Sequence, residues 1–285
     1  MSAPGRSQAL IPEHGSAQGR PVRLLRKARR LAAGLVLAGL QAAAAAQGAA
    51  AVADAADDDA DADVPYSAAV VVADPWEPFN RAIFKFNQDL DAGLLYPWAD
   101  AYVTLVPQLA RTGIHNFFNN FEDLWSGVNN LLQGKLERSI AMSFRFVWNT
   151  VFGWGGLLDM ATEFGIPRTP EDFGQTLGVW GVPPGNFLML PLFGPSTLRD
   201  AVALPLDIAA TPSYAIGEAA FRPVTTVLQI VDTRAQLLGA DQLLDTIALD
   251  KYSFVRDAFL TRRLNLVWDG NPPEPPAEAA KTPTP

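Results

Sequence analysis

Large apolar side chains recur at helical spacing in the middle of the chain, and this pattern restricts the fold more than any other feature of the sequence. The intervals between them alternate between three and four residues, which places them on one face of an α-helix. The opposite face carries Asn, Ser, Asp and Glu, and Gly134 follows as a typical C-terminal stop. The residues on the apolar face are Phe117, Phe118, Phe121, Leu124, Trp125, Val128, Leu131 and Leu132.

The same periodicity returns along most of the remaining core, so the sequence predicts an all-α fold. No alternation of apolar and polar residues with period two stands out. Pro75 and Pro78 suit the first turn of the earliest helix, Gly239 is expected to end the fourth, and Asp241 is expected to cap the fifth. The expected helices cover residues 79–90, 117–132, 136–151, 224–238, 242–249 and 251–267.

Aromatic residues are dense and charges are sparse in this core. Only 18% of the chain is charged, against about 25% in an average soluble domain. Residues 74–270 hold 27 of the 28 aromatic residues. We therefore expect some of the rings to face something other than a protein interior.

The two ends of the chain differ in composition from the core. Residues 1–46 combine a basic cluster, the uncharged run 31–46 and small residues typical of a cleavage site, so they predict a secretory signal peptide, with a retained anchor helix as the alternative. The Ala- and Asp-rich stretch 47–73 is expected to be a disordered acidic linker, and 271–285 a disordered tail. The helical domain then spans 74–270.

A stretch of 26 uncharged residues, 173–198, lies at the centre of the domain. Its length would suit a membrane-spanning helix, but glycines and prolines interrupt it repeatedly. Irregular backbone in apolar surroundings must be buried by protein or line a cavity. The segment is therefore either a buried core loop or the wall of an apolar channel, and the residues alone leave both open.

Several function classes lack the residues they need. After residue 30 the chain carries 15 basic and 29 acidic residues, which excludes nucleic-acid binding by phosphate neutralisation. There is no cysteine, and His14 and His115 are the two histidines. No metal-ligand, nucleotide or cofactor motif occurs, so we expect no metal, no cofactor and no enzyme. A carboxylate pair for hydrolysis could in principle come from Asp159, Glu163, Glu171, Asp172, Asp200 and Asp207, but such residues more often are helix caps or ion-pair partners.

A series of short motifs resembles the MlaA (VacJ) family of outer-membrane phospholipid-transport proteins. The opening motif is the most specific, and its matching residues are Asp74, Pro75, Phe79, Asn80, Arg81, Phe86 and Asn87. The other motifs follow in the family's order at 116–120, 131–134, 145–150, 153–159, 172–178, 190–200 and 233–238. One such motif would be weak, but eight in order indicate the family over nearly all of the domain.

The resemblance implies a ring of amphipathic helices around a central amphipathic channel, embedded in the periplasmic leaflet of the outer membrane. It implies a non-enzymatic conduit that removes misplaced phospholipids from the outer leaflet, beside a trimeric porin, and passes them to a periplasmic carrier resembling MlaC. The family is typically acylated on a cysteine, which this sequence lacks. Lys251 also stands where the family usually has proline, between Asp250 and Tyr252.

Three sets of candidate residues follow from this combined interpretation. The lipid-channel candidates are Phe173, Leu177, Val179, Trp180, Phe187, Leu190, Leu192, Phe193, Arg199 and Asp200, of which the last two could equally be a structural ion pair. The candidates for a hinge or for close packing are Gly153, Gly155, Gly156, Gly178, Gly181 and Gly194. The membrane-face candidates are Phe117, Phe118, Phe121, Leu124, Trp125 and Val128.

Two other functions compete with the conduit. A soluble periplasmic scaffold or interaction protein would keep its rings in the core and needs no acyl anchor. A carboxylate-based envelope hydrolase would lose turnover on Asp159→Asn or Asp200→Asn.

Overall fold

The computed structural model describes residues 72, 74–211, 220–239 and 248–273. The expected signal peptide, nearly all of the expected linker and most of the expected tail lie outside the described residues. So does most of the helix expected over 242–249.

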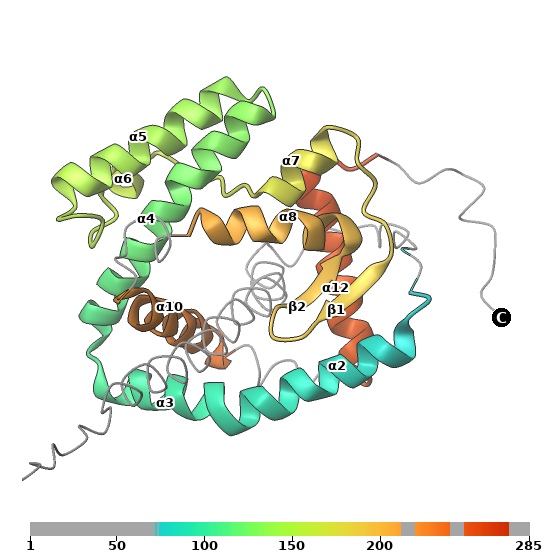
Figure 1. Ribbon diagram of the computed structural model, residues 1–285. Helices are drawn as coiled ribbons and strands as arrows, with labels where there is room; N and C mark the ends of the chain where they lie inside the picture. Colours follow the sequence, from blue (N-terminus) through green and yellow to red (C-terminus); the bar gives the residue numbers. More distant parts are fainter. Residues whose placement is uncertain (1–71, 73, 212–219, 240–247, 274–285) are drawn as a thin grey trace, which may run out of the picture.

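The N-terminal helices form one continuous arm (Figure 1). Helix α2 (Glu77–Leu90) has Pro78 in its first turn, where the missing N–H of proline costs no hydrogen bond. It continues through a π-helical turn, η1 (Asp91–Leu95), into α3 (Tyr96–Leu105). The sequence therefore located α2 correctly but gave no sign of α3.

Two long helices pack side by side after this arm (Figure 1). Helix α4 (Gln108–Leu132) begins nine residues before its expected start, and α5 (Leu136–Phe152) matches the expected helix to within one residue. Gly134 has a φ of +78°, the left-handed conformation that ends a helix and that side chains disfavour. The short helix α6 (Met160–Glu163) follows, with Asp159 as its N-cap.

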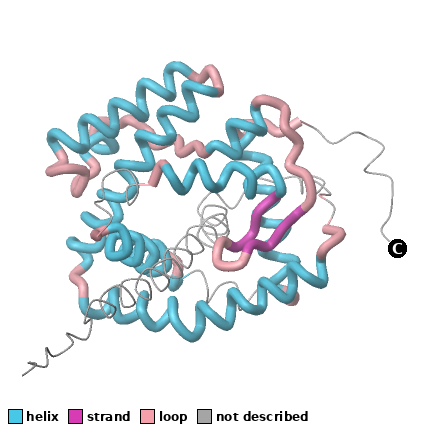
Figure 2. The backbone as a smooth tube through the Cα atoms, viewed as in Figure 1, coloured by secondary structure: helices cyan, strands magenta, loops and turns pink. Residues whose placement is uncertain are grey.

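The uncharged segment contains a β-hairpin that the sequence analysis did not predict (Figure 2). Helix α7 (Phe173–Val179) precedes strands β1 (Phe187–Leu190) and β2 (Gly194–Thr197), which pair antiparallel with Phe187 opposite Thr197. The fold is thus predominantly helical, as expected, but not purely so. Strands of four residues are too short to produce a period-two signal.

Three helices complete the described chain. Helix α8 (Leu198–Ala209) starts directly after β2, with Thr197 as its N-cap. Helix α10 (Arg222–Gln236) ends three residues before Gly239, its expected stop. Helix α12 (Lys251–Val267) has the expected bounds, and the Asp250 side chain caps it by accepting from the backbone N–H of Tyr252.

The elements form a ring (Figure 1). The contacts between them run in a closed circuit: α2 meets η1, η1 meets α3, α3 meets α10, α10 meets α4, α4 meets α7, α7 meets α12, α12 meets β2, β2 pairs with β1, and β1 returns to α2. Helix α8 joins this circuit through α7 and β2, while α5 and α6 extend outward from α4 (Figure 1). This arrangement is the ring that the family resemblance implied.

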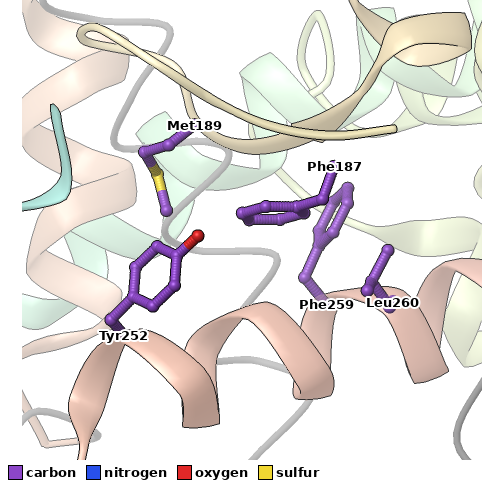
Figure 3. Packing of buried hydrophobic residues seen from close by; sticks show 5 residues of the cluster. All are labelled: Phe187, Met189, Tyr252, Phe259 and Leu260. Carbon is purple, nitrogen blue, oxygen red and sulfur yellow. The ribbon is translucent and has the colours of Figure 1, made fainter. Parts of the chain in front are cut away.

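The buried hydrophobic residues of the described chain form separate clusters at the contacts of this ring. One lies between the hairpin and α12, where Phe187 and Met189 meet Tyr252, Phe259 and Leu260 (Figure 3). Another joins α3 to α10 through Ala99, Tyr102, Val231 and Ala235. These small clusters contain few of the large apolar side chains of the described residues. Many of the other large apolar side chains are exposed.

Candidate functional site

Helices α4 and α5 turn their apolar faces outward. Ile140 and Val147 on α5 are 61% and 53% exposed, although both have large apolar side chains. A continuous apolar surface of this extent is rare on soluble monomers and marks an interface with lipid or another molecule. We call this surface the apolar belt; it comprises Leu124, Val128, Leu131, Leu132, Leu136, Ile140, Phe144, Val147, Val151 and Phe152.

The polar faces of the same two helices are buried. Asn129 and Asn130 are completely inaccessible, and Asn129 Oδ1 accepts a hydrogen bond of 2.8 Å from the Thr176 hydroxyl. Arg145 is buried as well and donates to Asp123 at 3.0 Å and to both carboxylate oxygens of Asp159. Because buried polar groups need partners, these contacts hold the polar side of α4 to α5 through Arg145 and to α7 through Asn129. This polarity is the reverse of a water-soluble helix pair.

A cavity of about 350 Å³ lies between α4, α7, α8, α12 and the hairpin. Its apolar lining includes Leu190, Phe193, Leu204 and Phe259. Charged groups line it as well, namely the acids Glu122, Glu171, Asp172, Asp200 and Asp207 and the arginines Arg168, Arg262 and Arg263. The cavity therefore combines apolar and charged surfaces, as a site for an amphipathic molecule requires.

Arg263 of α12 organises one wall of this cavity. It donates to both carboxylate oxygens of Asp172, at 2.5 and 2.6 Å, and to both oxygens of Asp200, at 3.0 and 2.9 Å. Arg199 donates from Nε to Asp200 at 3.0 Å. Burial alone would raise the pKa of Asp172, but the Arg263 charge and hydrogen bonds hold it below its ordinary value.

Asp207 is the acid of the cavity with the most perturbed ionisation. Its Oδ1 accepts hydrogen bonds from the Trp125 indole at 2.8 Å and from the Phe173 backbone N–H at 2.9 Å. Burial, reinforced by the nearby charge of Asp172, raises the pKa of Asp207 to about 6. Its charge therefore changes just below neutral pH.

The lipid-channel candidates occupy different places in the structure. Leu190, Phe193 and Asp200 line the large cavity, and Arg199 lines a second, smaller one. Phe187 is fully buried in the core beside α12, which leaves it no open space to line. Phe173, Leu177 and Leu192 are half-buried, whereas Val179 and Trp180 are exposed. Arg199 and Asp200 form the structural ion pair that the sequence left as an alternative.

The glycine candidates lie mainly at close contacts. A Cβ on Gly153 would lie 2.2 Å from the Leu158 carbonyl oxygen, and one on Gly156 would lie 2.7 Å from Asn120 Nδ2. A Cβ on Gly178 would lie 2.7 Å from Arg199 Nη1. Gly155 and Gly181 have positive φ without close neighbours, and Gly194 lies buried in β2.

The membrane-face candidates divide along α4. Leu124 and Val128 are exposed and belong to the apolar belt. Phe117 and Phe121 are half-buried and their rings stack edge to face. Phe118 is buried, and Trp125 lines the large cavity and donates to Asp207, so both point away from the exposed face.

The opening motif fastens α2 to the hairpin and to α12. Asn80 is buried and bonds the backbone of Phe187 and Met189 through its amide, while the Asn87 side chain bonds the backbone of Leu190 and Leu192. Asp74, with Pro75 after it in a turn, accepts from Asn80 and from the Tyr252 hydroxyl. Arg81 donates to both carboxylate oxygens of Asp250, and Phe79 and Phe86 are exposed.

Sequence reasoning missed the central role of Arg263, because no local pattern distinguishes it from a surface arginine of a helix. Five of the six acids considered for hydrolysis, all but Glu163, have structural partners among the described residues. Asp159 and Asp172 are the N-caps of α6 and α7, and Asp200 pairs with Arg199 and Arg263.

Among the described residues, no helix is both long and apolar enough to cross a membrane. The same residues contain no group of three or more side chains placed to hold a metal ion.

The chain is similar to known proteins in both sequence and structure. A family model described as MlaA lipoprotein matches residues 72–265. The chain is 38% identical over 197 residues to the intermembrane phospholipid transport system lipoprotein MlaA of Escherichia coli K12, covering 67% of this chain and 76% of the relative. The Haemophilus influenzae protein of the same name is 32% identical over 201 residues, covering 69% and 80%.

A solved structure described as "Structural basis for maintenance of bacterial outer membrane lipid asymmetry" is similar as well. It superposes with a TM-score of 0.60 at 38% identity, covering 68% of this chain and 99% of the solved chain.

Proposed function

The chain belongs to the MlaA lipoprotein family, and from this premise we propose that it is the outer-membrane component of an intermembrane phospholipid transport system. In this role it removes mislocalised phospholipids from the outer leaflet and thereby maintains outer-membrane lipid asymmetry. The protein is a conduit, and its acids and arginines bind and orient lipid without breaking a bond.

The observation that carries this proposal is the reversed polarity of α4 and α5. Their asparagines and an Arg–Asp network are buried, while the apolar belt faces outward. In water this arrangement would expose a large apolar area at considerable cost. In the interfacial region of a bilayer the belt contacts acyl chains, so the same arrangement becomes favourable.

The large cavity supplies the second requirement of a conduit. Leu190 and Phe193 give acyl chains an apolar surface, and Asp200 with Arg263 gives the headgroup polar partners. The cavity is enclosed by α4, α7, α8, α12 and the hairpin. We propose this cavity as part of the lipid path, with Asp200 in its polar lining and Arg199 in the wall of the adjoining smaller cavity.

The belt also suggests how the protein stays at the membrane. The family is described as lipoproteins, but this sequence contains no cysteine for acylation. We propose that an exported chain attaches through the apolar belt and through contact with a trimeric porin, on the periplasmic side of the outer membrane. A periplasmic carrier resembling MlaC would then receive the lipid.

Deletion of the gene tests the function directly. The account predicts that outer-leaflet phospholipid rises in the deletion strain and returns to the wild-type level when the full chain is restored. Labelling of outer-leaflet phosphatidylethanolamine by an amine reagent that does not cross the membrane measures this level. An unchanged level in the deletion strain contradicts the proposed function.

Two further measurements separate the competing functions. A soluble scaffold would be recovered in the periplasmic fraction, whereas the conduit should fractionate with outer membranes and carry bound phospholipid. A hydrolase would turn over lipid esters and lose this turnover in Asp159→Asn, whereas a conduit leaves labelled lipid chemically unchanged.

A further inference from the structure

A second cavity, of about 220 Å³, lies between α7, α8 and α12 and is separated from the large cavity by Arg263. This volume is more than ten times the roughly 10–15 Å³ that one water molecule needs. Most of the lining is apolar and includes Val182, Leu260, Leu264, Val267 and Trp268. A lining of this kind suits a ligand that carries an apolar portion.

Arg199 lies in the wall of this small cavity and is incompletely satisfied. Its side chain is 5% exposed, and its Nε donates to Asp200 at 3.0 Å. Within the described part of the chain, its two Nη groups donate to no acceptor. A buried guanidinium with free donors beside a cavity is a ready partner for an anion, because buried donors gain most from being paired.

The ion-pair cluster lies between the two cavities, and Arg263 lines both of them. Arg199 and Arg263 line the small cavity, which has no acid among its described lining residues. Their carboxylate partners, Asp172 and Asp200, line the large cavity instead. The small cavity is thus lined by the cationic side of the cluster, without its carboxylates.

We propose that the small cavity binds the phosphodiester group of a phospholipid, with Arg199 as its ligand. The planar fork of a guanidinium matches phosphate oxygens, and the apolar lining accepts the adjoining glycerol and the start of the acyl chains. This inference rests on the proposed function for the identity of the phosphate source.

Binding of lipids to the purified full chain tests the site. Phosphatidylglycerol with a photoreactive group beside its phosphate is added in detergent micelles, cross-linked, and located by peptide mass spectrometry; native mass spectrometry gives the affinity. We expect cross-links at Val182, Leu264 or Trp268. Arg199→Gln should weaken this binding at least about tenfold, because it removes one charge-assisted hydrogen bond to the phosphate. Arg199→Lys keeps the positive charge and should retain part of the binding.

Control variants and control ligands separate the effect of the Arg199 charge, the effect of the cavity volume and the origin of the phosphate. Leu264→Trp fills the cavity without changing Arg199 and should also abolish the cross-links, whereas Lys85→Gln at an exposed site should not. Diacylglycerol, which lacks the phosphate, should bind at least about tenfold more weakly than phosphatidylglycerol. Equal binding of diacylglycerol, unchanged binding to Arg199→Gln, or competition by inorganic phosphate at matching affinity would overturn the proposal. Because the assay uses purified protein, its result stands independently of the deletion phenotype.

Discussion

Arg263, near the end of α12, donates hydrogen bonds to both carboxylate oxygens of Asp172, the N-cap of α7. The two residues are 91 positions apart in sequence. Since Arg263 also holds Asp200, a single side chain connects α7, α8 and α12 and forms the boundary between the two cavities.

Replacing Arg263 tests the importance of this connection. Arg263→Met leaves the partly buried Asp172 without its cation, and breaking a buried pair costs up to about 3–5 kcal/mol. Denaturant unfolding of the purified chain measures the loss. The double variant Arg263→Met/Asp172→Asn should recover part of it, since no carboxylate is left uncompensated. A loss below about 1 kcal/mol in the single variant would show that the pair is dispensable.

Asp207 should make folding stability depend on pH. Its pKa is raised to about 6 in the folded protein, so the folded chain retains a proton that the unfolded chain releases at lower pH. The protonated Asp207 side chain therefore contributes to the free energy of unfolding. This contribution is complete below the ordinary carboxyl pKa and is lost as pH rises through about 6.

Asp207→Asn should remove the loss of folding stability that accompanies ionisation of Asp207. The variant should be less pH-dependent between about pH 4 and 6 and more stable than wild type at pH 7, by up to about 3 kcal/mol. Unfolding curves across this range measure both effects. Asp89→Asn, at an exposed acid, is the matched control; equal pH profiles for Asp207→Asn and wild type would be incompatible with the assignment.

Two neighbouring glycines distinguish close packing from a hinge. Gly156→Ala brings a Cβ to 2.7 Å from Asn120 and should destabilise the chain by about 1–3 kcal/mol. Gly155→Ala meets open space and carries only the backbone cost of its positive φ, about 1 kcal/mol. Comparison of the two unfolding free energies checks the difference. A hinge would instead leave stability similar in both variants and alter transport.

A charge within the apolar belt should weaken membrane association. Ile140→Glu and Val147→Glu place a carboxylate on the exposed apolar face, and each should reduce partitioning into liposomes at least about tenfold. Gln88→Glu adds the same charge at an exposed polar position and serves as control. Liposome flotation measures the bound fraction; unaltered flotation of both belt variants would show that the belt does not contact lipid.

The sequence predicted those parts of the fold that local periodicity controls. The bounds of α5 and α12 follow closely from their patterns, and the end of α4 is indicated by Gly134. Strands β1 and β2 escaped prediction because each is four residues long and one of them contains Gly194 and Pro195. Helix α3 escaped because its apolar residues are too evenly distributed to mark one face.

The candidate site was predictable only in part, because its geometry depends on distant contacts. The uncharged segment supplied Leu190, Phe193 and Asp200 to the large cavity, but Phe187 entered the core. Arg263 and Asp172 are 91 residues apart, and no local sequence pattern predicts that they form an ion pair. Periodicity identified an apolar face on α4 but did not reveal that its polar face would be the buried one.

Spin labelling at the belt tests the central claim most directly. Because the chain contains no cysteine, a single Val147→Cys substitution provides one unique labelling site, and Lys85→Cys provides an exposed reference. In liposomes containing the purified protein, the account predicts that the label at position 147 is accessible to molecular oxygen and protected from a water-soluble nickel reagent. A label at position 147 that is as accessible to the nickel reagent as the label at position 85 would contradict a lipid-facing belt.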